Sequence, residues 1–248
     1  MASDMAAKTP PERNRYVDFL RAVSILVVVV GHWLIATAWY VDGELTPGHL
    51  LKSHAQYQWL TWLFQVMPIF FIVGGYSNAV SLESAKRKGQ GYADWLVTRL
   101  HRLMSPLLVL VIAWACVAGV MTLMGVRPVV IEFTSQAALI PTWFLAIYIT
   151  LVLLAPVAYK FWRRFGFLSF WIFVGLAALV DVLFFAADIR WPGWTNYFWV
   201  WLGVHQLGFA WRDGRMGSAG KLLVYSALGF AVLYALVYWG PYPKAMVG

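Results

Sequence analysis

Residues 22–40 read AVSILVVVVGHWLIATAWY, nineteen consecutive residues without a formal charge. As an α-helix this stretch has about the length needed to cross the hydrocarbon core of a lipid bilayer. His32 lies in the middle of it. An imidazole inside a membrane span loses its hydration unless it faces a partner or a water-filled cavity, so His32 is a candidate functional residue. The alternative is a lone histidine whose polar atoms are satisfied by a neighbouring helix.

The composition of the whole chain indicates a polytopic membrane protein. Of its 248 residues, 61% are hydrophobic and only 12% are charged, whereas a soluble domain is about one-quarter charged. Seven segments are long and apolar enough to span a bilayer, at residues 17–40, 57–82, 104–126, 138–159, 168–187, 194–211 and 222–239. We therefore predict an all-α fold with about seven transmembrane helices. Residues 1–16 would form an N-terminal tail and residues 17–248 a single domain.

The basic residues predict the orientation. Fifteen of the nineteen lysines and arginines flank the side of the predicted bundle that carries the N-terminus, and four flank the other side. Basic residues concentrate in cytoplasmic flanks, so we expect a cytoplasmic N-terminus and a multi-pass location in the cell membrane. The net charge of +8 is explained in this way without a nucleic-acid partner. The single cysteine, Cys116, excludes an internal disulfide and a cysteine-built metal site, and we predict no metal.

A charged motif precedes the first predicted span. Residues 15–21 read RYVDFLR, and a heptad count places Asp18, Arg21 and His32 on one helix face. Asp18 and His32 are fourteen residues apart, about 21 Å along a helix, so Asp18 cannot orient the imidazole. Asp18 is instead expected to pair with Arg21 at the i, i+3 spacing.

Two further motifs lie near the predicted cytoplasmic surface. G-G-Y-S-N at residues 74–78 places Tyr76, Ser77 and Asn78 within an apolar helix; taken alone, we interpret it as a helix-packing notch with polar contacts. R-L-H-R-L-M-S-P at residues 99–106 places Arg99 and Arg102 on one face, where planar guanidinium groups suit phosphate or carboxylate. Ordinary cytoplasmic charge in contact with anionic lipid is the alternative for this pair. Residues 92–103 are expected to form an interfacial helix that leads into the third span.

Polar and aromatic groups also occur in the later spans. P-T-W-F-L-A-I-Y at residues 141–148 contains Trp143 and Tyr148, which fit either an aromatic belt or the protein core. His205 and Gln206 form a polar pair in the sixth predicted span, and the pair has little significance by itself.

In this order the four motifs resemble the acyltransferase-3 family of integral-membrane acyltransferases, over residues 15 to about 211. The resemblance implies transfer of an acyl group, commonly acetyl, from a cytoplasmic donor such as acyl-CoA to a hydroxyl of a sugar or another envelope molecule. It implies that His32 is catalytic and that Arg21, Arg99 and Arg102 bind the donor. Asp18, Tyr76, Ser77, Asn78, Trp143 and Tyr148 are expected to support the site. Acyl-CoA would be a co-substrate, with no permanently bound cofactor. Family members usually carry more spans, so we expect the 248-residue chain to be an incomplete catalyst.

The residues agree with direct acyl transfer. His32 would lie about 16 Å deeper than Arg21 on the same face, near an acyl carbon delivered by the pantetheine arm. A neutral imidazole there would accept the proton of the acceptor hydroxyl. The sequence has no G-x-S-x-G elbow, which argues against an acyl-enzyme. Membrane lipid and a carbohydrate or lipid-linked acceptor are the expected partners. The main alternative function is a transporter or flippase for a lipid-linked or sugar-like molecule, and a seven-span receptor ranks lower.

Overall fold

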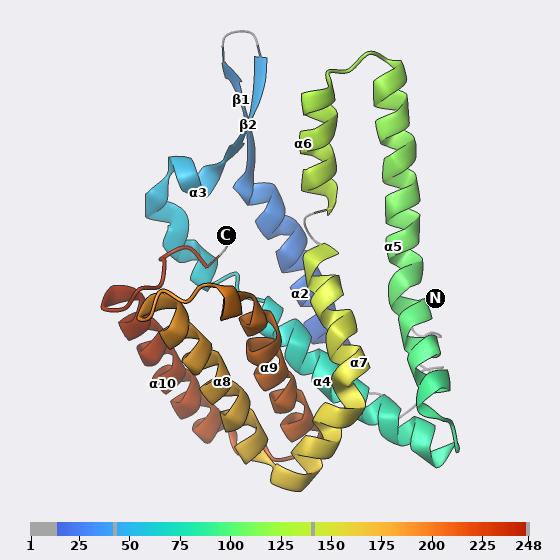
Figure 1. The fold of residues 1–248 in the computed structure, drawn as a ribbon, viewed down its shortest axis with the longest axis vertical. Helices are drawn as coiled ribbons and strands as arrows, with labels where there is room; N and C mark the ends of the chain where they lie inside the picture. Colours follow the sequence, from blue (N-terminus) through green and yellow to red (C-terminus); the bar gives the residue numbers. More distant parts are fainter. Residues whose placement is uncertain (1–13, 42–43, 140–141, 247–248) are drawn as a thin grey trace. The chain divides into compact units, whose positions relative to one another are not determined.

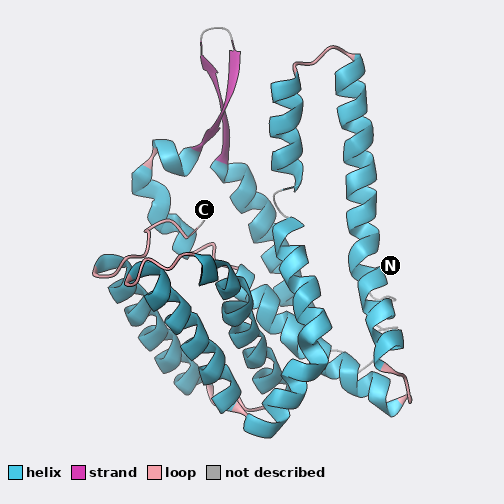
Figure 2. Cartoon of the chain, in the orientation of Figure 1, coloured by secondary structure: helices cyan, strands magenta, loops and turns pink. Residues whose placement is uncertain are grey.

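The computed structural model describes residues 14–41, 44–139 and 142–246. It is 83% helical, which confirms the helical character predicted for the chain. Figure 2 shows the helices in cyan. The chain divides into two compact units, one comprising Met1–Val73 with Lys244–Gly248 and the other Gly74–Pro243.

The first unit begins with helix α2 (Arg15–Ile35), followed by an antiparallel hairpin of β1 (Ala36–Val41) and β2 (Glu44–His49), drawn in blue in Figure 1. The prediction of one helix over residues 17–40 is therefore wrong at its C-terminal end. The sequence A-T-A-W-Y-V of β1 is rich in β-branched and aromatic residues, which favour strands over helices. Gly48 on β2 makes room for Trp39, since an added Cβ would lie 2.5 Å from the Cδ1 atom of that ring.

Two short helices and the C-terminal segment complete this unit. Helix α3 (Leu50–Ser53) is followed by the 3₁₀ helix η1 (Ala55–Trp62). The C-terminal segment binds back to η1 and the residues after it: the indole of Trp62 donates to the carbonyl of Lys244 at 2.9 Å, and the amide N–H of Met246 donates to Thr61 Oγ1 at 3.0 Å. These bonds explain why the last residues of the chain belong to the first unit.

Helix α4 (Met67–Arg87) contributes to both units. The predicted span of residues 57–82 lies within the candidate span Ala55–Arg87, in which η1 comes first and α4 begins at Met67. Pro68 explains this start: it has no N–H to donate and its fixed φ suits the first turn of a helix. Gly74 and the residues after it carry α4 into the second unit.

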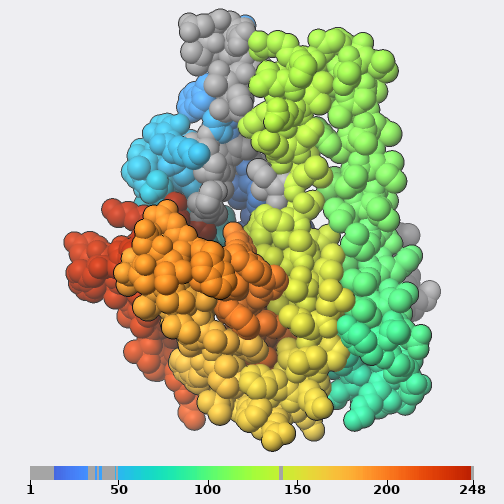
Figure 3. All heavy atoms as spheres, viewed as in Figure 1, coloured from blue at the N-terminus to red at the C-terminus, as the bar shows by residue number. Residues whose placement is uncertain are grey.

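The second unit continues with α5 (Tyr92–Leu123), α6 (Pro128–Leu139) and α7 (Thr142–Phe165). Helix α5 is unbroken over 32 residues, which confirms that residues 92–103 are helical and lead into the third predicted span. Helix α6 was not predicted. It lies along α5, with their side chains in contact in Figure 3, and the indole of Trp114 donates to Ser135 Oγ at 2.9 Å.

The remaining elements are α8 (Phe167–Phe185), η2 (Trp191–Thr195), α9 (Asn196–Arg212) and α10 (Ala219–Tyr238). Helix α9 packs against both α7 and α8, and seven of its 17 residues are buried. Among the described residues, five helical segments are long and apolar enough to cross a membrane: Ala55–Arg87, Tyr92–Leu123, Pro128–Phe165, Phe167–Phe185 and Ala219–Tyr238. The structure thus supports five of the roughly seven predicted spans.

Candidate functional site

The predicted catalytic histidine lies in the last turns of α2, in the first unit. Asp18 and Arg21 form the expected i, i+3 ion pair, with 3.7 Å between their side-chain atoms. His32 Nδ1 is 2.7 Å from the carbonyl oxygen of Val28, one turn earlier. A carbonyl oxygen only accepts, so Nδ1 carries the hydrogen of this bond. The neutral ring then has its lone pair on Nε2, and the side chain is exposed.

The two glycines of G-G-Y-S-N allow α4 to approach two other helices of the second unit. A Cβ added to Gly74 would lie 2.5 Å from Cε2 of Tyr148 on α7. A Cβ added to Gly75 would collide with the carbonyl oxygen of His205 on α9 and lie 3.1 Å from the Cα of Gly208. The structure therefore gives this pair of glycines the helix-packing role that the motif alone favours, and it gives Tyr148 a place in the protein core.

Asn78 on α4 joins three helices, since its side chain contacts α5 and α9. Its Oδ1 accepts from Arg99 Nη2 at 2.6 Å, and its Nδ2 lies 3.1 Å from His205 Nε2. Arginine only donates, so the amide oxygen must face Arg99 and the amide nitrogen must donate to His205. His205 Nε2 is consequently an acceptor, and the neutral ring carries its hydrogen on Nδ1. Both Asn78 and His205 are completely buried.

The other predicted site residues of the second unit are dispersed. Tyr76 packs against the indole of Trp211, with ring centroids 4.8 Å apart. Ser77 is half-buried on α4 and Arg102 is exposed on α5. Trp143 is exposed and meets Tyr197 edge to face at 6.5 Å.

The structure thus brings Asn78 and Arg99 into contact, and Tyr148 against Gly74. Asp18, Arg21 and His32 belong to the first unit and the remaining predicted residues to the second. A joint site formed by His32 with Arg99 and Arg102 therefore stays a prediction.

A charged cluster that the sequence analysis missed joins α4, α7 and the end of α9. Glu83 pairs with Arg212 and accepts a hydrogen bond from the hydroxyl of Tyr159. Arg212 Nη1 also donates to Asp213 Oδ1 at 2.8 Å, and the indole of Trp162 donates to Asp213 Oδ2 at 2.8 Å. Partial burial tends to raise the pKa of Asp213, but the hydrogen bonds from Trp162 and Arg212 outweigh it and lower that pKa. The available signal was an acidic residue, Glu83, three residues before the basic run Lys86, Arg87 and Lys88.

The same cluster borders a polar cavity of about 440 Å³. Five residues line it: Trp162, Arg163, Arg212, Asp213 and Arg215. Guanidinium groups, a carboxylate and an indole N–H give this cavity the chemistry of an anion site rather than of an acid–base pair.

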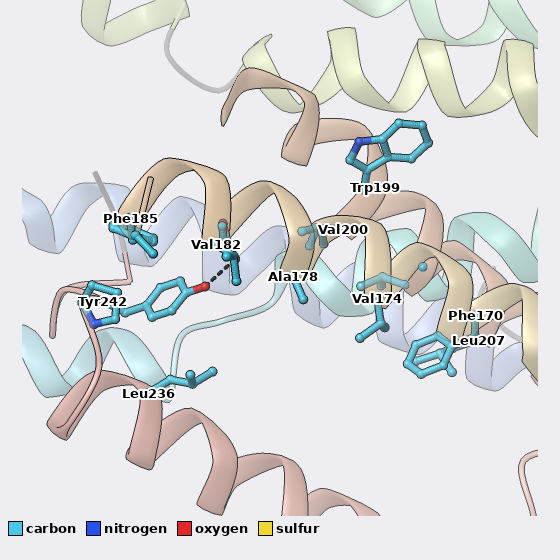
Figure 4. Close-up of a pocket in the computed structure, with 16 residues that line it drawn as sticks. Phe170, Val174, Ala178, Val182, Phe185, Trp199, Val200, Leu207, Leu236 and Tyr242 are labelled. Atoms are coloured by element: carbon cyan, nitrogen blue, oxygen red, sulfur yellow. Dashed lines mark hydrogen bonds between the residues drawn. The ribbon is translucent and has the colours of Figure 1, made fainter. Parts of the chain in front are cut away.

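A second, apolar cavity of about 660 Å³ lies between α8, α9 and the segment that follows α10 (Figure 4). Asp181 is the charged residue of its lining, and its carboxylate accepts hydrogen bonds from Asn196 at 2.7 Å and from the hydroxyl of Tyr242. Burial and the bond to Asp181 raise the pKa of Tyr242, so the phenol keeps its proton. Since Asp181 already holds two partners, this cavity offers mainly an apolar surface. An aspartate inside an apolar helix was a signal that the sequence analysis passed over.

The described residues contain no group of three or more histidine, cysteine, aspartate or glutamate side chains arranged to hold a metal ion. A family model described as an acyltransferase domain matches residues 14–247, across both units. The chain belongs to the acyltransferase-3 family. The resemblance stated from the sequence is thereby confirmed.

Comparison with curated proteins and with solved structures gave no match. Membership of the acyltransferase-3 family implies acyl transfer to hydroxyl groups by a membrane protein. The apolar helices agree with that location.

Proposed function

We propose that this protein is an O-acyltransferase that moves an acyl group, most simply acetyl, from acyl-CoA to a hydroxyl of a sugar or another envelope molecule, with His32 as general base. One observation carries the assignment of His32. The bond from Nδ1 to the Val28 carbonyl holds the imidazole against its own helix and leaves Nε2 as the basic nitrogen on an exposed side chain.

The reaction follows from this tautomer. Nε2 accepts the proton of the acceptor hydroxyl while the hydroxyl oxygen forms a bond to the thioester carbonyl carbon. The bond from that carbon to sulfur then breaks, and the thiolate of coenzyme A takes the proton back from the imidazolium. A carbon–oxygen bond thus replaces a carbon–sulfur bond, and one proton moves from the acceptor hydroxyl to the thiol of coenzyme A. No covalent enzyme intermediate is needed. Arg21, Arg99 and Arg102 are proposed to bind the donor, and the family membership supports an acyl-transfer role for the site.

The positive-inside pattern supports a donor site on the cytoplasmic side of the cell membrane. Arg102 is exposed and has the freedom to bind a donor phosphate, whereas Arg99 is anchored to Asn78 at 2.6 Å. Arg102→Ala should therefore raise the KM for acyl-CoA more than it lowers kcat.

The function is tested by adding acetyl-CoA labelled in the acetyl group to membranes that contain the protein or its His32→Ala variant. Label should appear in an envelope lipid or glycan only with the unsubstituted protein, with one acyl-sized mass increase by mass spectrometry. Label that stays in acetyl-CoA, together with movement of an unmodified sugar or lipid across the membrane, would show a transporter instead.

A further inference from the structure

The polar cavity of the second unit lies where α7 ends, α8 begins and α9 ends. Its walls are held in place by hydrogen bonds between its own lining residues. Trp162 is almost completely buried, and its indole N–H is fixed on Asp213, which in turn accepts from Arg212. Arg212 is also held by Glu83 from α4. Trp162, Arg212 and Asp213 therefore form a hydrogen-bonded wall of the cavity, and the exposed Arg163 and Arg215 complete its lining.

Two arginines of the lining keep hydrogen-bonding capacity for a ligand. The side chain of Arg163 is 62% exposed, and its closest approach to Glu83 is 3.9 Å. The guanidinium of Arg215 lies 5.9 Å from the ring centroid of Trp162, and no carboxylate of the described residues forms an ion pair with it. Each guanidinium has five N–H donors, so most of the donors of both residues stay available.

The start of α8 adds to the positive potential. Gly166 precedes the first turn with φ at 54°, a left-handed conformation that favours glycine. A Cβ at this position would lie 3.4 Å from Arg215 Nη1, so the arginine reaches the N-terminal end of the helix. Helix N-termini attract anions, and this one lies beside a free guanidinium.

The sum of charges also favours an anion. The three arginines of the lining, together with Asp213 and Glu83, carry three positive and two negative charges, which leaves one net positive charge. Both carboxylates are bound to Arg212, so the excess is located at Arg163 and Arg215. Guanidinium groups bind phosphate oxygens in a bidentate manner and more strongly than neutral donors do.

We propose that this cavity, through Arg163 and Arg215, binds a phosphate ester, namely the phosphate-bearing nucleotide end of the acyl-CoA donor. The inference rests on the proposed acyl-CoA function. It adds a phosphate contact at the ends of α7 and α9 to the one proposed for Arg102. An anionic lipid headgroup presents the same phosphate chemistry, and the experiment separates the two sources.

The test measures equilibrium binding of coenzyme A and of dephospho-coenzyme A to the full chain in nanodiscs of phosphatidylcholine. Arg163→Gln and Arg215→Gln should each weaken coenzyme A binding by roughly 10-fold or more, as expected for loss of charge-assisted hydrogen bonds. At least one of the two substitutions should weaken dephospho-coenzyme A less, because that ligand lacks the 3′-phosphate. Arg164→Gln is the matched control: Arg164 is the next residue on α7, is exposed, and does not line the cavity.

The outcomes separate the inference from the proposed function. Acyl transfer from acyl-CoA with unchanged coenzyme A affinity in both variants would overturn the cavity assignment and leave the function standing. Weaker coenzyme A binding in both variants, with no acyl transfer by the unsubstituted protein, would support the cavity and refute the function. A third result would assign the cavity to lipid and overturn the donor assignment: unchanged coenzyme A binding together with loss of bound phosphatidic acid in native mass spectrometry.

Discussion

His32 on α2 and His205 on α9 both lie within helices of this protein, and they have opposite environments. His32 on α2 is exposed, bonds only to a carbonyl of its own helix among the described contacts, and has Nε2 available. His205 on α9 is completely buried, and its Nε2 accepts from Asn78. The same side chain therefore has its basic nitrogen accessible in one place and occupied in the other.

This difference separates the chemical role proposed for His32 from the structural role of His205. A general base needs a lone pair that a substrate hydroxyl can reach, and His32 meets that condition. His205 instead ends a chain of hydrogen bonds from Arg99 through Asn78, which ties α5, α4 and α9 together. Interhelical polar contacts of this kind stabilise membrane bundles.

The largest expected effect tests the role proposed for His32 in this comparison. His32→Ala should lower the rate of acyl transfer by about 10²–10⁴-fold, because it removes the proposed general base. Expression and thermal unfolding in detergent should stay close to those of the unsubstituted protein, since the exposed imidazole makes only a local bond. Transfer within a few-fold of the original rate would exclude His32 from the chemistry.

The contact of α4 with α9 is tested by a glycine substitution. Gly75→Ala should lower the free energy of unfolding by about 1–3 kcal/mol, because the new methyl group collides with the backbone of His205 and the helices must separate. Gly119→Ala on α5 is the matched control, since nothing lies within 4 Å of an added Cβ there. Equal unfolding temperatures for the two variants would contradict this packing.

A substitution of the buried histidine tests the structural role of His205. His205→Leu should lower the free energy of unfolding by about 0.5–2 kcal/mol, because Asn78 loses its acceptor inside the bundle. His205→Gln should lose less, since its amide oxygen can accept the same bond. The rate of transfer per folded molecule should fall far less than in His32→Ala. A fully folded His205→Leu protein without activity would make His205 part of the chemistry.

The smallest expected effect concerns pH. The folded pKa of Asp213 is lowered below its ordinary value of 3.8, so its stabilising contribution is present above that value and is lost as the pH falls through the folded pKa. Asp213→Asn should cost about 1 kcal/mol in the free energy of unfolding at pH 7 and less at strongly acid pH. Asp188→Asn, at an exposed pair with Arg190, should change little. Parallel pH profiles for Asp213→Asn and the original protein would refute the bond.

The sequence predicted elements better than contacts. Long apolar runs predict helices because each run must satisfy its own backbone in lipid, and α5, α8 and α10 follow that rule. The helix predicted over residues 36–40 is wrong because the length of an apolar run does not distinguish a helix from a strand. Local β propensity decides the structure there. The Asp18–Arg21 pair was predictable because the i, i+3 spacing lies within one helix.

The contacts of the cluster around Glu83 could not be predicted from the sequence, because its members are separated by up to 130 residues along the chain. Only the packing of α4, α7 and α9 brings Glu83, Tyr159 and Arg212 together. The sequence analysis also ranked His205 low, since a polar residue in a span gives no indication of which helix supplies its partner.

The unbroken length of α5 makes the protein sensitive to the membrane around it. Its 32 residues correspond to about 48 Å, against a hydrocarbon thickness of about 30 Å. The apolar part after Arg102 matches that thickness, so the arginines lie at its edge. A thicker bilayer would draw Arg99 and Arg102 toward hydrocarbon, and the helix must tilt or the bilayer must thin to prevent it. Hydrophobic mismatch thus acts on the same helix that holds Asn78 through Arg99.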